Sequence, residues 1–172
     1  MRVFLTGFMG AGKTVVGELL AGRLGVPFVD LDREIEARAG VGIRQIFATQ
    51  GEAAFRQVER EALRAVIAAL PDAVVATGGG TFTFEANARL IGENGMSVFL
   101  NPAFSTIVAR IGGLGKADRP LFRDETQALA LYRERLPAYR RADLTVDVGM
   151  GEGPQEVAAR IALLIGTRGC AT

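Results

Sequence analysis

Short apolar runs alternate along the chain with longer segments in which apolar residues recur at helical spacing. The runs predict five strands, at Val3–Thr6, Pro27–Val29, Ala73–Thr77, Met96–Leu100 and Leu144–Val148. The periodic segments predict helices at Lys13–Leu24, Leu31–Ala39, Ile43–Ala48, Gly51–Leu70, Phe84–Ile91, Ala103–Arg110, Glu125–Arg140 and Pro154–Ile165. Because strands that alternate with helices form parallel sheets covered by helices, we expect a three-layer α/β domain with a five-stranded parallel sheet.

Glycine and proline mark where several of these elements end or bend. Gly25 is expected to stop the first helix, and Pro137 to kink the helix that contains it. Two segments depart from the regular alternation: Leu31–Glu61, and the glycine-rich Gly112–Asp124. We expect both to be excursions from a single domain spanning residues 1–172, and to be its most mobile parts.

The composition excludes several kinds of chemistry. A chain of 172 residues with 49% apolar content can build one compact core. Without histidine it can hold neither a Ser-His-Asp triad nor a histidine-ligated metal, and its single cysteine, Cys170, cannot form an internal disulfide. No apolar stretch approaches the roughly 18 residues that cross a bilayer. We therefore expect a cytoplasmic protein with no membrane partner.

The charge also limits the partners. A net charge of +1 provides no field that would recruit nucleic acid. The distribution is uneven, because residues 110–141 include eight basic and four acidic side chains. This surplus favours a small anionic ligand, although a solvated helix face would account for part of it.

A phosphate-binding motif follows the first predicted strand. Gly7–Thr14 reads GFMGAGKT and matches G-x-x-x-x-G-K-[ST] in full, with a strand before it and a helix after it. Loop and helix N–H groups bind phosphate oxygens, Lys13 adds a catalytic charge, and the Thr14 hydroxyl is placed to ligate Mg²⁺. The chain carries no Asn-Lys-x-Asp motif for guanine and is short for a motor ATPase, so a small ATP-dependent kinase remains. The predicted nucleotide-binding residues of the loop are Gly10, Ala11, Gly12, Lys13, Thr14 and Val15.

Two carboxylates, Asp30 and Asp32, follow the second predicted strand. Ligands of open α/β sheets lie beyond the carboxyl ends of the strands, which is also where the phosphate loop lies. One carboxylate can hold a metal-bound water while the other accepts a proton or a hydrogen bond from an acceptor hydroxyl. Alternatively, Asp30 caps the helix that begins at Leu31 and Asp32 lies in its first turn, where aspartate is favoured in any case.

Six segments, taken in order, make the chain resemble shikimate kinases. They read GFMGAGKT, FVDLD, IFATQGEAAFRQVE, ATGGGT, DRPLF and ERLPAYRRAD, and the resemblance extends from Val3 to about Ile165. It implies a P-loop NTPase fold of the nucleoside-monophosphate-kinase type, with a substrate-binding excursion and a lid. It also implies the transfer of phosphate from ATP to shikimate, on the pathway to chorismate and the aromatic amino acids. We expect the enzyme to act as a monomer.

The resemblance also implies an acceptor site. Asp32 would bind substrate hydroxyls and act as the base, while Arg56 and Arg135 would hold the substrate carboxylate through their guanidinium forks. Gly79 would contact substrate through its backbone. Without the resemblance, either arginine could be a solvated surface charge, and Gly78–Gly80 could be only a tight turn.

The implied nucleotide site extends beyond the loop. Asp30 would join Thr14 in the Mg²⁺ site, and Arg119 would reach the transferring phosphate from the lid. Arg110 and Pro154 would flank the adenine.

Two alternatives remain open. Another small-metabolite kinase, such as a gluconate kinase, would recognise a similar combination of a carboxylate and hydroxyls. A nucleotide-binding regulator without catalysis would use the same fold. The presence of Lys13, Asp32 and Arg119 together argues against a regulator, because a pure sensor need not keep the apparatus for phosphate transfer.

Overall fold

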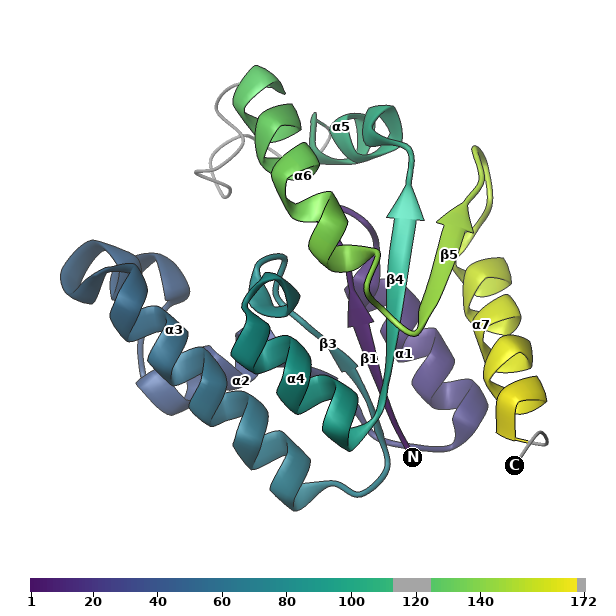
Figure 1. The fold of residues 1–172 in the computed structure, drawn as a ribbon, viewed down its shortest axis with the longest axis horizontal. Helices are drawn as coiled ribbons and strands as arrows, with labels where there is room; N and C mark the ends of the chain where they lie inside the picture. The colour runs from purple at the N-terminus through teal and green to yellow at the C-terminus, as the bar shows by residue number, and fades with distance from the viewer. Residues whose placement is uncertain (113–124, 170–172) are drawn as a thin grey trace.

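The structure, a computed structural model, describes residues 1–112 and 125–169 (Figure 1). Its strands form one sheet in the order β2-β3-β1-β4-β5, and every neighbouring pair is parallel. This confirms the predicted five-stranded parallel sheet. The strands are β1 (Arg2–Thr6), β2 (Phe28–Asp30), β3 (Ala73–Ala76), β4 (Met96–Pro102) and β5 (Leu144–Val148).

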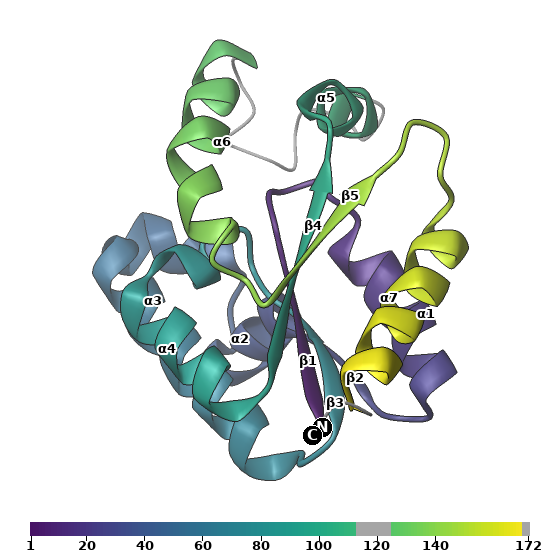
Figure 2. The same ribbon diagram turned by 45° about the vertical axis from the view of Figure 1, so that its right-hand side comes forward.

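Helices cover both faces of the sheet. In Figures 1 and 2, α1 and α7 lie side by side on one face, while α2, α3 and α4 lie on the other. The remaining two, α5 and α6, lie at the end of the sheet where the strands finish. This arrangement confirms the three-layer α/β fold. The helices are α1 (Lys13–Leu24), α2 (Leu31–Ala39), α3 (Ile43–Ala69), η1 (Thr81–Thr83, a 3₁₀ helix), α4 (Glu85–Asn94), α5 (Phe104–Gly112), α6 (Glu125–Tyr139) and α7 (Pro154–Gly169).

The central strand β1 serves the cores on both faces. Successive side chains of a strand point to opposite sides, so Val3 and Leu5 join the core under α1 and α7, while Phe4 joins the core under α3 and α4. A third cluster packs the loop after β1 against α5 and α6, and this packing supports the phosphate loop. Its fully buried members are Phe8, Phe99, Ile107, Ile111 and Tyr139.

The element boundaries follow the predictions closely, with informative differences. Gly25 ends α1 in the left-handed conformation, at φ 67°, as predicted. The two helices predicted on either side of residue 50 run on as α3, but Gly51 interrupts the helical backbone with φ 81° and ψ 177°. η1 was not predicted. Pro137 lies inside α6, and the kink expected there stays a prediction.

Some expectations concern residues outside the described ranges. Arg119 and Cys170 lie outside them, as does all of the predicted lid 112–124 except Gly112. Within those ranges, none of the helices combines the length and the apolar character needed to cross a membrane.

Candidate active site

The loop between β1 and α1 folds as the phosphate-binding motif predicts. Gly7, Gly10 and Gly12 adopt φ values of 142°, 76° and 97°, a region that residues with side chains rarely occupy. The Lys13 ammonium folds back over this loop and donates hydrogen bonds to the carbonyl oxygens of Gly7 (2.8 Å) and Phe8 (3.0 Å). The lysine charge is therefore held against the loop whose N–H groups bind phosphate in this motif.

Asp30 fits both interpretations of its position. Its Oδ1 caps α2 by accepting hydrogen bonds from the N–H groups of Asp32 (3.1 Å) and Arg33 (3.4 Å). Its Oδ2 accepts a hydrogen bond from the Thr14 hydroxyl (3.0 Å). One aspartate thus joins the end of β2 to the first turn of α1.

The donors at this point suit Mg²⁺, which prefers hard oxygen ligands. Thr14 supplies a hydroxyl and Asp30 a carboxylate, and the two are already in contact. No cluster of three or more metal-binding side chains of His, Cys, Asp or Glu occurs in the described part of the chain. Mg²⁺ commonly takes one or two protein ligands and completes its shell with phosphate and water, so this small donor set fits it.

The glycine turn after β3, Gly78–Gly80, touches all three side chains predicted to bind the acceptor. A β-carbon on the first glycine would lie 2.8 Å from Oδ1 of Asp32. One on the middle glycine would lie 3.6 Å from Nη1 of Arg135, and one on the third would lie 2.8 Å from Nη2 of Arg56. These side chains come from α2, α3 and α6, and the lack of side chains on the turn lets them converge.

The same turn adjoins the phosphate loop. A β-carbon on Gly79 would lie 3.4 Å from the backbone nitrogen of Met9 and 3.9 Å from the carbonyl oxygen of Gly7. The three converging side chains are therefore next to the loop that carries Lys13. This is the geometry needed to hold an acceptor beside a phosphate donor.

The surroundings of the Asp32 carboxyl raise its pKa. Desolvation by the surrounding protein atoms raises its pKa to about 6, and repulsion from Asp30, Glu59 and Glu36 adds to the increase. The charge of Lys13 opposes the shift. The residue as a whole is nevertheless exposed at the surface of the site.

Arg56 is held by a buried acid and an exposed one. Its Nη1 donates to both carboxylate oxygens of Glu59, at 3.1 and 3.0 Å, and Glu59 is only 1% exposed. Its Nε and Nη2 donate to Oε1 of Glu52, at 3.3 and 3.2 Å, and the Glu52 side chain is 62% exposed. The guanidinium also lies over the Phe84 ring, 4.3 Å from its centroid. The Nη1 side of the guanidinium is thus held by a buried carboxylate, while the side with Nε and Nη2 contacts an exposed one.

Sequence reasoning missed Glu59. Besides holding Arg56, its carboxylate accepts hydrogen bonds from the Thr81 hydroxyl (2.7 Å) and the Asn87 amide (3.2 Å), and so it joins α3 to η1 and α4. A signal was present. Glu59 lies three residues after Arg56, on the same helix face as the buried Phe55 and Leu63, and an acid on a buried apolar face requires partners.

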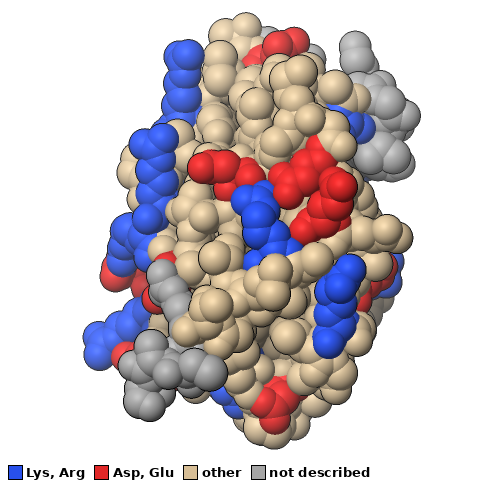
Figure 3. Space-filling model, turned by 90° about the vertical axis from the view of Figure 1, so that its right-hand side faces the viewer, with Lys and Arg blue, Asp and Glu red and all other residues tan. Residues whose placement is uncertain are grey.

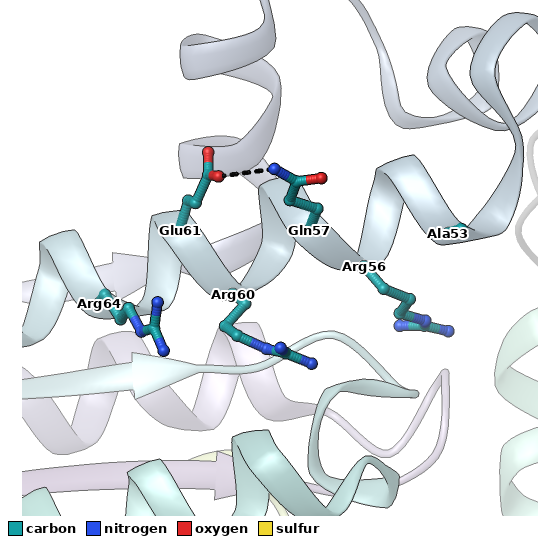
Figure 4. A pocket seen from close by; sticks show the side chains of 6 residues that line it. All are labelled: Ala53, Arg56, Gln57, Arg60, Glu61 and Arg64. Carbon is teal, nitrogen blue, oxygen red and sulfur yellow. Dashed lines mark hydrogen bonds between the residues drawn. The ribbon is translucent and has the colours of Figure 1, made fainter.

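A groove of about 390 Å³ runs along α3 beside Arg56 (Figure 4). Arg56, Arg60 and Arg64 project from the same side of the helix in that view. Glu61 accepts a hydrogen bond from Gln57 (3.2 Å) on another side of the helix, and the Nε of Arg60 is buried without a hydrogen-bond partner. The approach to Arg56 along α3 is therefore positively charged. The groove is lined by Ala53, Arg56, Gln57, Arg60, Glu61 and Arg64.

The predicted adenine-flanking residues lie on two sides of the phosphate loop. The Nη1 of Arg110, on α5, donates to the carbonyl oxygens of Gly10 (3.3 Å) and Ala11 (3.1 Å). Pro154, at the start of α7, lines a cavity of about 720 Å³ together with Val15, whose side chain is largely exposed on the first turn of α1. The structure brings Val15 and Pro154 together, and Arg110 is not among the residues that line their cavity.

The face of the molecule around α7 carries charges of both signs (Figure 3). Arg160, for example, pairs with Glu152 at 2.8 Å.

Comparisons with known proteins agree with this geometry. The family model described as shikimate kinase matches residues 9–165. A Salinibacter ruber protein named shikimate kinase is 42% identical over 172 residues, covering 94% of this chain and 82% of the relative. The structure of shikimate kinase from Acinetobacter baumannii in complex with shikimate has a TM-score of 0.88 at 34% identity, covering 97% of this chain and 93% of that chain. The crystal structure of shikimate kinase from Aquifex aeolicus has a TM-score of 0.83 at 35% identity and covers 100% of both chains.

Proposed function

The chain belongs to the shikimate kinase family, and we propose how its residues carry out that family's reaction. The enzyme transfers the terminal phosphoryl group of ATP to a hydroxyl of shikimate, leaving ADP and shikimate 3-phosphate, in the biosynthesis of aromatic amino acids. Family membership does not favour a gluconate kinase, and the relatives named as kinases argue against a regulator without catalysis. The observation that carries the residue roles is the convergence of Asp32, Arg56 and Arg135 on the glycine turn beside the phosphate loop.

In our proposal, the shikimate carboxylate binds between Arg56 and Arg135, because guanidinium groups pair with carboxylates through two parallel hydrogen bonds. Glu59 keeps the Nη1 edge of Arg56 occupied, so the substrate would take the edge that Glu52 contacts from its exposed position. The backbone of Gly79 would contact the substrate. The positively charged groove along α3 would favour the arrival of an anionic acceptor.

Asp32 would accept the hydrogen bond and then the proton of the attacking hydroxyl. Only the carboxylate form can do this, and a pKa of about 6 leaves that form predominant at neutral pH. The phosphoryl group would pass from the leaving oxygen of ADP to the substrate oxygen, while Lys13 and the loop N–H groups stabilise its charge. Arg119 would add a second cation, a role that stays a prediction because it lies outside the described residues.

ATP would bind through Gly10, Ala11, Gly12, Lys13, Thr14 and Val15, with Arg110 and Pro154 near the adenine. Thr14 and Asp30 would hold a Mg²⁺ ion, which, when bound, neutralises phosphate charge and orients the phosphate groups. We further propose that the enzyme acts in the cytoplasm as a single-domain monomer. Its excursion 31–61 would bind shikimate, and the lid predicted at 112–124 stays a prediction because residues 113–124 lie outside the described ranges.

A coupled assay of ADP release tests the function. Shikimate should stimulate release strongly above the rate with water alone, and gluconate at the same concentration should not. A rate with shikimate no higher than the rate with water would refute the proposed acceptor. Product analysis by phosphorus NMR should show one phosphate ester on the ring.

A further inference from the structure

A buried phenol lies directly behind the acceptor site. Tyr139 is the last residue of α6, is 0% exposed, and donates a hydrogen bond from its hydroxyl to the carbonyl oxygen of Gly79. Its ring stacks on Phe99 of β4, with centroids 5.2 Å apart and planes inclined by 28°. Packing of the ring in the core thus fixes the position of the hydroxyl, which contacts the middle residue of the glycine turn.

We propose that Tyr139 is a positioning residue that holds both the Gly79–Gly80 peptide and the Arg135 guanidinium in place for the acceptor. This proposal rests on the proposed function, in which Gly79 and Arg135 contact shikimate. It adds a group that touches neither substrate and acts only through two that do.

The glycine turn needs such a restraint. Three consecutive glycines have more backbone freedom than any other tripeptide, and they have no side chains to lock their conformation by packing. A hydrogen bond to the Gly79 carbonyl oxygen fixes the peptide plane between Gly79 and Gly80, and so the direction of the next N–H group. Burial raises the pKa of Tyr139 to about 12, so its hydroxyl keeps the proton that it donates.

Arg135 acts electrostatically on the same phenol. It lies one helical turn before Tyr139 on α6, so the two side chains share a face of the helix. Its Nη1 is 3.6 Å from the position of a β-carbon on Gly79, and its charge acts on the phenol. The phenol oxygen can accept from Arg135 while donating to Gly79. One hydroxyl is therefore placed to set the position of the Gly79 carbonyl relative to Arg135.

Tyr139→Phe tests this, because it removes the hydroxyl and keeps the stacked ring. We expect the KM for shikimate to rise roughly five- to tenfold, the size expected for one buried hydrogen bond, while the KM for ATP changes less than about twofold. The matched control is Tyr132→Phe on the same helix, whose hydroxyl donates to Oδ1 of Asn101 (3.2 Å). It should leave the KM for shikimate unchanged.

The outcomes separate the possibilities. Equal changes in both KM values, or a lower melting temperature with neither KM changed, would show that Tyr139 is only structural and would overturn the proposal. Wild-type enzyme that does not turn over shikimate in the same assay would refute the proposed function instead.

A second measurement needs no variant. NMR relaxation of the free wild-type protein should give the N–H groups of Gly79 and Gly80 order parameters as high as those of β3, about 0.85. Values below about 0.6 would mean that the turn is not held before substrate binds, and the proposal would fail.

Discussion

Replacing Glu59 by glutamine removes a buried charge while keeping the shape of the side chain. The Glu59 carboxylate is 1% exposed and accepts hydrogen bonds from Arg56, Thr81 and Asn87. Glutamine offers one acceptor oxygen in place of two, and its amide N–H groups would face donors. At least one of these three partners would lose its acceptor, and the Arg56 charge would lose its buried counter-charge.

The expected decrease in the free energy of unfolding follows from the burial of Glu59. Breaking a buried ion pair by removing one partner costs about 3–5 kcal/mol, and because Arg56 is 14% exposed and keeps Glu52, we expect about 3 kcal/mol. For a chain of this size, each kcal/mol lowers the melting temperature by roughly 2–4 °C, so Glu59→Gln should lower it by about 6–12 °C. Because Arg56 loses the contact that orients it, the KM for shikimate should rise as well.

Glu52→Gln is the matched control. It removes a hydrogen-bonded acid from the same arginine, but from a side chain that is 62% exposed. Exposed pairs contribute at most about 1 kcal/mol, so the melting temperature should fall by no more than roughly 2–4 °C. Calorimetric melting at pH 7 and shikimate kinetics would be measured for both variants and the wild type.

Equal losses of stability in the two variants would refute the reasoning, because burial is the property that distinguishes the two acids. A decrease of less than about 1 kcal/mol in the free energy of unfolding of Glu59→Gln would also refute it. Such a result would show that the buried carboxylate contributes little to stability through its contacts with Arg56, Thr81 and Asn87.

Four further predictions concern the acceptor site and the groove beside it. Arg135→Ala should raise the KM for shikimate at least tenfold with little effect on the KM for ATP, and steady-state kinetics showing equal losses would mean that its role is misassigned. Because Asp32 must be deprotonated to act, kcat/KM for shikimate should increase as pH rises through about 6 and then level off. The raised pKa also means that the contribution of Asp32 to stability is fully present below its ordinary pKa of 3.8 and is lost as pH rises through about 6. Asp32→Asn should therefore be inactive yet more stable above pH 6, by about 1 kcal/mol after screening of a partly solvated charge, and urea unfolding at pH 5 and 8 checks the sign. Arg60→Gln, which removes a groove charge without touching the site, should lower kcat/KM for shikimate at low salt and match the wild type at high salt; a loss that salt does not change would rule out steering.

Much of this molecule is determined by local patterns. Helical and strand periodicity, together with Gly25, predicted every strand and the course of α1 and α2, because these elements follow from backbone hydrogen bonding and side-chain spacing over a few residues. The phosphate loop was readable for the same reason, since its glycines and Lys13 act within one short segment. The cap formed by Asp30 was one of the two alternatives that the sequence left open, and it could be foreseen because its partners lie two and three residues away.

The acceptor site could be listed from a resemblance, but only the tertiary structure shows how it is held. Asp32, Arg56 and Arg135 meet because the sheet order places β3 between β2 and β1, and α6 returns across the end of the sheet. Arg56 depends on Glu59, which is itself tied to residues 22 and 28 positions further along the chain.

The contact between Tyr139 and Gly79 joins groups 60 residues apart, and the pKa of Asp32 is raised by desolvation and by charges that include Glu59 on another helix. Local patterns therefore predict the strands, most of the helices and the nucleotide loop. Which polar groups face each other across the acceptor site, and how strongly each is charged, was decided by the folded chain, because burial and long-range contacts exist only after the layers have packed.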